Sequence, residues 1–223
     1  MIDRLPRWVW AGAGLLALIA GMVNVVGLLG FEHQAVTHLT GTTTMLGAAL
    51  ARQDGYGVRH FAALLASFMA GAMLSGFIVR DSTLRLGRRY GAALALESLL
   101  LAAAASLLSR ERELGHYLAS CAIGLQNAMV STYSGATIRT THVSGMFTDL
   151  GIYAGHAMRG MRVDLRRMRL SLLVIGGFLA GGIAGAALFD RYSYATLYIP
   201  AALTGLVALS YGLYNTYFRS AQL

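Results

Sequence analysis

The amino-acid sequence predicts an all-α, polytopic integral membrane protein. Of its 223 residues, 56% are hydrophobic and only 13% are charged. The apolar residues are also gathered into long runs that are almost free of charge. Soluble domains contain about 25% charged residues, and about 20 consecutive apolar residues are enough to cross a bilayer as a helix. We therefore expect a single transmembrane domain over residues 1–223.

Six stretches are candidates for membrane-spanning helices. Two of them contain several polar residues (Leu118–Tyr133 and Tyr194–Tyr217), and four are almost uniformly apolar (Trp8–Gly30, Phe61–Val79, Gly91–Leu108 and Leu170–Phe189). The first run follows a short charged segment, as in a secretory signal peptide. It is longer than the apolar region of such a peptide, so we expect it to be retained as a helix.

The net charge of +8 arises from 18 arginines in a chain without lysine. A basic soluble domain would indicate a nucleic-acid partner. Here the arginines lie between the apolar runs, where positive charge sets the orientation of membrane helices. We therefore expect no nucleic-acid partner and a cytoplasmic N-terminus, with the cluster Arg159–Arg169 near anionic lipid headgroups. Cys121 is the single cysteine and can form no internal disulfide.

One polar sequence occurs twice in this apolar chain. THLTGTTTMLG begins at Thr37 and THVSGMFTDLG begins at Thr141, and six of the eleven positions are identical. Similar matches occur upstream, where GMVN corresponds to GLQN, and downstream, where FMAGAMLSG corresponds to FLAGGIAGA. The two copies begin 104 residues apart. A repeat with so long a period indicates a duplicated domain rather than a solenoid. We expect an internal repeat over residues 8–108 and 115–217. Its small-xxx-small patterns, from Gly71 and from Gly181, favour close helix packing.

The orientation of the two halves depends on whether the repeated sequences cross the membrane. After Gly41 and Gly145 only about ten to fourteen residues precede the next charged loop, too few for a crossing. If neither copy spans, each half crosses three times, the second half is inverted, and 13 of the 18 arginines are cytoplasmic. If both span, the chain makes eight crossings in parallel repeats and 12 arginines are cytoplasmic. Segment length favours two inverted repeats, each with three spanning helices and one short half-helix.

A short helix that begins inside the bilayer would explain the repeated polar sequence. The first N–H groups of a helix have no intrahelical acceptor, and they attract anions. We expect the hydroxyl of Thr40 or Ser144 to cap such a start, and Gly41 or Gly145 to allow a ligand to approach closely. Two half-helices that meet at a repeat interface hold the substrate in many secondary transporters. The alternative is that these residues serve only helix packing.

We expect substrate-binding residues in the two repeated sequences and in the helices before them (Asn24, Thr37, His38, Thr40, Gly41, Thr42, Gln126, Asn127, Thr141, His142, Ser144, Gly145 and Thr148). For the amides, a helix–helix hydrogen bond is the competing interpretation. Ionisable residues within membrane segments are candidate functional residues. Asp149 and Glu97 are therefore candidates for ion coupling or proton transfer. Asp149 could instead neutralise Arg139, and Glu97 could pair with an arginine of a neighbouring helix.

Motifs for enzymatic chemistry are missing from the sequence. It contains no HExxH, no Gly-x-Ser-x-Gly and no paired cysteines. We expect His33, His60 and His116 to lie in loops, and no pair of histidines has metal-ligand spacing. The prediction is a protein without catalytic residues, metal or cofactor.

The motifs resemble those of the YoaK-type bacterial membrane proteins, a family whose domain has no known function. The resemblance covers about residues 10–215 and rests on an Asn-bearing first helix, on the sequence GLQNA from Gly124, and on the two Thr/Ser-Gly sequences. In that family the first of these usually reads Thr-Gly-Asn, whereas here it reads Thr40-Gly41-Thr42. The resemblance implies a multi-pass protein of the bacterial inner membrane.

These observations favour a small secondary transporter or carrier whose solute is anionic or carries a carboxylate. The expected partners are membrane lipid and a small-molecule or ion substrate, and assembly into a homo-oligomer stays open. One alternative is a membrane scaffold or sensor that transports nothing. Another is an intramembrane enzyme in which His38, His142 and Asp149 converge.

Overall fold

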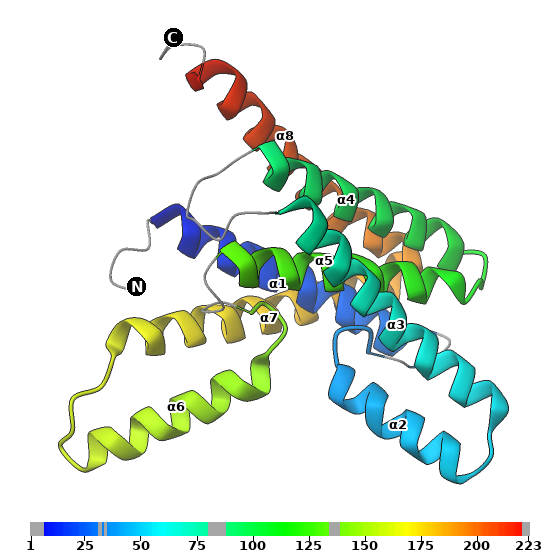
Figure 1. Ribbon diagram of the computed structural model, residues 1–223, viewed down its shortest axis with the longest axis horizontal. Coiled ribbons are helices and arrows are strands. Elements are labelled where there is room, and N and C mark those ends of the chain that lie inside the picture. Colours follow the sequence, from blue (N-terminus) through cyan, green and yellow to red (C-terminus); the bar gives the residue numbers. More distant parts are fainter. Residues whose placement is uncertain (1–6, 31–32, 34, 80–87, 134–138, 220–223) are drawn as a thin grey trace.

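The structure is a computed structural model that describes residues 7–30, 33, 35–79, 88–133 and 139–219. In these residues every regular element is a helix (Figure 1). In chain order the helices are α1 (Arg7–Leu29), α2 (Leu39–Ala51), α3 (Gly55–Ile78), α4 (Arg88–Leu108), α5 (Leu114–Tyr133), α6 (Val143–Met158), α7 (Leu165–Tyr192), the 3-10 helix η2 (Ser193–Leu197) and α8 (Tyr198–Arg219). The predicted all-α class is confirmed.

The long helices coincide with the predicted apolar runs. Four stretches of the described chain are long and apolar enough to cross a membrane: Trp8–Leu29, Gly55–Ile78, Arg89–Leu108 and Leu165–Leu213, the last of which covers α7, η2 and most of α8. The helices α2 and α6 contain only 13 and 16 residues. At about 1.5 Å per residue both are shorter than the hydrocarbon core of about 30 Å. The chain is a polytopic α-helical membrane protein.

Long helices from the two halves of the chain pack against each other. α1 packs along α7 and α3 packs along α5, so that the first long helix of each half lies against the third helix of the other half. α4 packs against both α5 and α8. In Figure 1, α1 and α5 run in opposite directions, and so do α3 and α7. Corresponding helices of the two halves therefore have corresponding partners.

Glycines bring these paired helices into backbone contact. A Cβ atom on Gly21 of α1 would collide with the carbonyl oxygen of Phe178 of α7. At the corresponding place in the other pair, a Cβ atom on Gly124 of α5 would collide with the carbonyl oxygen of Phe68 of α3. Such contacts let membrane helices pack closely without a hydrophobic driving force between them. Gly71 and Gly181, for which the sequence predicted close packing, make the same kind of contact with the carbonyl oxygens of Cys121 and Leu18, so their packing role is confirmed.

The third helix of each half begins at an aspartate cap. The side chain of Asp54 accepts hydrogen bonds from the backbone N–H groups of Tyr56 and Gly57 at 3.2 and 3.1 Å. The side chain of Asp164 accepts from Arg166 and Arg167, both at 3.1 Å. An aspartate at this position satisfies N–H groups that have no acceptor within the helix. Each cap therefore fixes the turn that follows a short helix.

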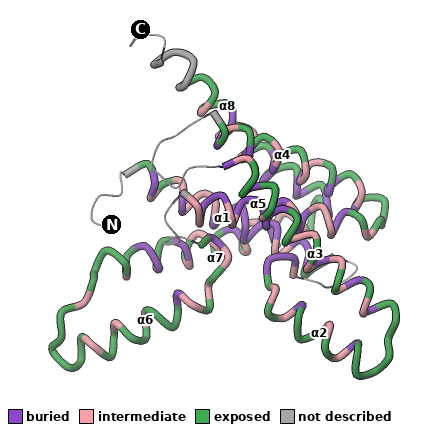
Figure 2. Tube along the Cα trace, in the orientation of Figure 1, coloured by how far each residue is buried: buried purple, intermediate pink, exposed green. Residues whose placement is uncertain are grey.

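The most deeply buried part of the molecule lies at the centre (Figure 2). Ile19 of α1, Leu101 of α4 and Ile123 of α5 are fully buried there in one apolar cluster. The short helices are different, because among the described elements α2 contacts only α3, and α6 contacts only α7. Both short helices are largely exposed and extend from the centre toward opposite sides (Figures 1 and 2).

Candidate functional site

The two short helices begin at histidines within the repeated sequences. The first intrahelical hydrogen bond of α2 joins the N–H of Thr42 to the carbonyl of His38 at 3.1 Å, and that of α6 joins Met146 to His142 at 3.2 Å. His38 and His142 are therefore the N-cap residues. The expectation that Thr40 and Ser144 cap these helices was wrong, because each N-cap lies two residues earlier and the first turn includes Thr40 or Ser144.

Each N-cap histidine lies over a glycine of the first turn. A Cβ atom on Gly41 would be 2.8 Å from Nδ1 of His38, and one on Gly145 would collide with the ring of His142. Neither histidine side chain makes a capping hydrogen bond. The side chains of these two N-cap residues therefore do not cap the first N–H groups of α2 and α6, and groups of this kind bind anions at helix starts.

The hydroxyls of the short helices bond to their own backbone. Thr42 donates to the carbonyl of His38 at 3.2 Å, and Thr148 donates to the carbonyl of Ser144 at 3.1 Å. This back-bonding is common for hydroxyl residues in helices. Thr42 is buried, whereas other polar residues of these helices are exposed (Thr40, Thr43, Thr44, Ser144, Thr148 and Asp149).

Asn24 ties α1 to the segment that leads into α2. Its Oδ1 accepts hydrogen bonds from the backbone N–H of Thr37 at 3.1 Å and from the Thr37 hydroxyl at 2.7 Å. Asn24 lies five residues before the end of α1. The contact therefore holds the segment just before α2 against the last part of α1. The structure thus brings two predicted site residues together. The competing interpretation of Asn24, a hydrogen bond between segments, accounts for its oxygen.

Gln126 makes the comparable connection in the second half. Its Nε2 donates to the carbonyl of Leu16 in α1 at 2.9 Å and to the hydroxyl of Thr140 at 3.0 Å. Gln126 and Thr140 are both fully buried. Thr140 is not one of the predicted residues, since the repeat pointed to Thr141 beside it, which is half-buried. The Oδ1 of Asn127 is buried and has no hydrogen-bond partner in the described part of the chain.

The two candidate proton carriers lie in different surroundings. Glu97 in α4 is fully buried, and neither carboxylate oxygen has a hydrogen-bond partner among the described residues. The alternative pairing with an arginine is therefore not found in that part of the chain. Asp149 is exposed on α6, and over the same residues it makes no ion pair with Arg139.

A buried polar cluster at the start of α3 and α5 was not expected. His60 and His116 lie in these helices and are buried, so their predicted place in loops was wrong. Nδ1 of His60 is 3.1 Å from the hydroxyl of Tyr117, and Glu113 accepts hydrogen bonds from Tyr56 at 2.7 Å and Tyr117 at 3.2 Å. The hydrogen bond from Tyr56 is the main cause of a lowered pKa of the Glu113 carboxyl.

The arrangement of this cluster does not match a metal centre. Over the described residues, no three His, Cys, Asp or Glu side chains are grouped so that they could hold a metal ion. His33 lies between α1 and α2, as expected, and its ring is 3.3 Å from the carbonyl of Leu28. The cluster around Glu113 instead joins α3 to α5 by hydrogen bonds.

Predicted residues of the two halves remain apart. The described parts of α2 and α6 make no contact with each other. The structure therefore brings together Asn24 with Thr37, His38 with Gly41, and His142 with Gly145. It does not bring the residues of the first half, among them His38 and Gly41, into contact with His142 and Gly145 of the second half.

Long apolar helices, together with two helices too short to span, define a polytopic α-helical membrane protein. Residues 12–210 match the family described as a protein of unknown function, DUF1275. Because the match covers most of the chain, the protein belongs to this family, and the resemblance to a YoaK-type family of unknown function is confirmed. No significant match was found among curated proteins or among solved structures.

Proposed function

We propose that the protein is a secondary carrier that moves a small anionic or carboxylate-bearing solute across the membrane. The solute binds at the starts of α2 and α6. The observation that carries this proposal is that both short helices begin without a side-chain cap, each beneath the ring of its N-cap histidine. Uncapped N–H groups and the helix dipole favour a negative group at these positions.

The exposed polar faces of the short helices support a water-accessible path. Thr43 and Thr44 of α2, and Thr148 and Asp149 of α6, are exposed within segments that enter the bilayer. Polar and charged groups at that depth are costly against lipid, and they usually face a water-filled cavity or another protein surface. A solute path beside α2 and α6 provides such an environment.

The proposal includes two inverted repeats with six crossings in total. The opposite directions of α1 and α5, and of α3 and α7, support it (Figure 1). The lengths of α2 and α6 also support it, because both are too short to span. The N-terminus lies in the cytoplasm in this arrangement, and the membrane is the bacterial inner membrane. Carriers of this architecture alternate access by moving one repeat against the other.

Purified protein tests the proposal by thermal shift and by uptake into proteoliposomes. The ligand panel consists of sodium salts of chloride, sulfate, phosphate, acetate and succinate. We expect at least one anion to raise the melting temperature, and the same anion to be taken up. A ligand at a hundredfold excess over its Kd stabilises by about 2.7 kcal/mol.

Glycine variants on the same helices provide matched controls. Gly41→Val and Gly145→Val should abolish stabilisation by the anion and its uptake, because the new side chain meets the histidine ring at the helix start. Gly47→Val and Gly151→Val occupy open space on the same helices and should retain both. The proposal is wrong if no anion is transported, or if the Gly41 and Gly145 variants respond like the parent protein. Scaffolding and enzymatic roles predict no uptake at all.

A further inference from the structure

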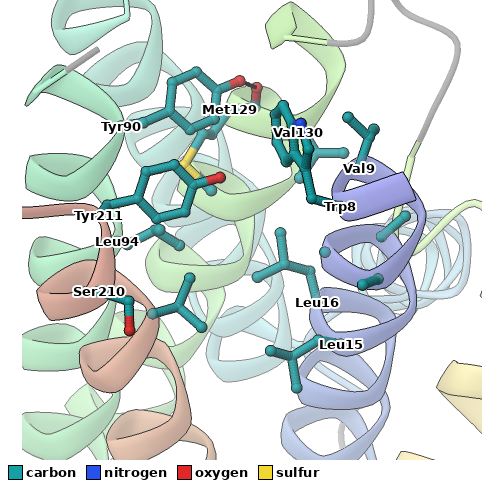
Figure 3. Close-up of a pocket in the computed structure, with 14 residues that line it drawn as sticks. Trp8, Val9, Leu15, Leu16, Tyr90, Leu94, Met129, Val130, Ser210 and Tyr211 are labelled. Carbon is teal, nitrogen blue, oxygen red and sulfur yellow. Dashed lines mark hydrogen bonds between the residues drawn. The ribbon is translucent and has the colours of Figure 1, made fainter. Parts of the chain in front are cut away.

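A cavity separate from the short helices lies between α1, α4, α5 and α8 (Figure 3). Its volume is about 540 Å³, a size typical of small-molecule sites, which measure about 300–1,000 Å³. No described residue that lines it is charged. The lining residues used below are Trp8, Leu16, Tyr90, Leu94, Met129 and Tyr211.

Aromatic side chains surround the outer part of the cavity. Trp8 of α1 stands opposite Tyr90 of α4 and Tyr211 of α8 (Figure 3). The hydroxyl of Tyr90 donates to the carbonyl of Met129 at 2.6 Å, which holds its ring in place. Aromatic faces bind apolar groups and also attract cations within about 6 Å.

Glu97 does not itself line the cavity, but it lies one helical turn beyond Leu94, which does. Leu94 lines the cavity, and Glu97 is the next fully buried polar residue along the same face of α4. Residues three positions apart are neighbours on a helix. Side chains of a helix also lean toward its N-terminus, so the carboxyl group of Glu97 leans toward Leu94 and the cavity.

The packing of α4 against α5 puts Glu97 and Gln126 within about one helical turn of each other. These two helices form an antiparallel pair joined by a short loop, and Tyr90 is opposite Met129. Two turns inward from this contact lie Glu97 on α4 and Ala122 on α5. Gln126 follows Ala122 by one turn, and all three residues are fully buried.

Three acceptor oxygens on these two side chains have no donor in the described part of the chain. Two belong to Glu97, and the third is Oε1 of Gln126. The orientation of the Gln126 amide is fixed, because its nitrogen donates to the carbonyl of Leu16, which can only accept. A buried acceptor without a donor destabilises the folded state. A ligand that brings donors and positive charge would satisfy these oxygens.

We propose that this cavity binds a lipophilic amine. The apolar body of the amine lies among Trp8, Tyr90 and Tyr211, and its ammonium group reaches Glu97 past Leu94. An ammonium group supplies three donors and one positive charge, which matches a carboxylate whose two oxygens lack donors. The proposal does not depend on the carrier function, because no residue of α2 or α6 lines the cavity.

Tryptophan fluorescence of the purified full-length protein tests the proposal. The chain contains only two tryptophans, Trp8 and Trp10, so Trp10→Phe leaves a single reporter in the wall of the cavity. The probes are 4-phenylbutylamine, 4-phenylbutanol and 4-phenylbutyrate, which share one apolar body and differ in charge. We expect the amine to change Trp8 fluorescence and to bind at least about tenfold more tightly than the alcohol or the acid, a difference of about 1.4 kcal/mol.

Replacing the Glu97 carboxyl group tests whether this residue causes the preference for the amine. Glu97→Gln keeps the shape of the side chain and should reduce amine affinity by about tenfold while leaving the alcohol unchanged. Glu113→Gln, a carboxylate outside the cavity, should preserve the preference for the amine. Equal affinity for all three probes, or displacement of all three alike by added phospholipid, would make the cavity a lipid site and overturn the proposal. A preference for the amine that survives in Glu97→Gln, or no amine binding to the parent, would also overturn it.

Discussion

The α-carbon of Gly181 in α7 lies so close to the carbonyl oxygen of Leu18 in α1 that no side chain fits between them. Gly71 of α3 meets the carbonyl oxygen of Cys121 of α5 in the same way. Gly182, the next residue along α7, has open space where its side chain would start. Two adjacent glycines in one helix therefore serve different purposes, and only the first is needed for the close approach of α7 to α1.

Alanine substitutions at Gly181 and Gly182 should distinguish the effect of helix packing on stability from the effect of helix propensity. Gly181→Ala should destabilise the protein by about 1–3 kcal/mol or more, because the added methyl group forces α7 away from α1. Gly182→Ala should be neutral or slightly stabilising, because alanine favours the helix over glycine. Melting temperatures in one detergent measure both variants. Equal melting temperatures would show that the contact at Gly181 does not limit stability.

Cysteine labelling should place the ends of the two short helices on opposite sides of the membrane. Arg52 ends α2 and Arg162 follows α6, and both residues are exposed. In a Cys121→Ser background, Arg52→Cys should react with an impermeant thiol reagent from outside intact cells. Arg162→Cys should react only after the membrane is opened. Labelling of both positions from the same side would eliminate the inverted arrangement in favour of parallel repeats.

The hydrogen bonds between Asn24 and Thr37 should contribute to stability in only one half of the protein. Thr37→Val removes the hydroxyl that donates to Asn24, and we expect a loss of about 1 kcal/mol. Thr37→Ser keeps the hydroxyl and should retain most of the stability. Thr141→Val is the matched substitution in the second repeated sequence. It should have little effect, because that hydroxyl has no partner among the described residues. Comparable losses in both valine variants would contradict this assignment.

The Glu113 cluster should make the protein less stable in acid. The hydrogen bond from Tyr56 lowers the pKa of the Glu113 carboxyl from its ordinary value of 4.5. A carboxyl with a lowered pKa stabilises the folded state above its ordinary pKa, and this contribution is lost as the pH falls through the lowered value. Tyr56→Phe and Glu113→Gln should each lower the melting temperature at neutral pH and weaken its dependence on acid. Glu111→Gln, an exposed neighbour, is the control, and melting curves between pH 3 and 7 measure the effect.

The number and position of the long helices could be predicted because a membrane helix needs a long uncharged run. Trp8–Gly30 and Leu170–Phe189 therefore coincide closely with α1 and α7. Their packing against each other could not be predicted in the same way. The glycines showed that some helices approach closely, but a small-xxx-small pattern does not name its partner. The packing of each first helix against the third helix of the other half required the coordinates.

The candidate site could be predicted only in part. Duplication identified the segments that begin the short helices, and the Asn24–Thr37 pair consists of two predicted residues. The N-cap residue was predicted wrongly, because Ser and Thr are much more common than His at N-cap positions. His60 and His116 were expected in loops because glycines and charged residues surround them in sequence. The cavity beside Glu97 could not be predicted, since four helices from distant parts of the chain contribute to it.

The pairing of α1 with α7 has a consequence for biosynthesis. α1 is synthesised before α2 to α6, and its packing partner α7 only after them. During that interval its glycine-lined face has no native neighbour and is covered by lipid or by the insertion machinery. Translation that stops before α7 therefore leaves a first helix in the membrane without the contact that holds it in the finished protein.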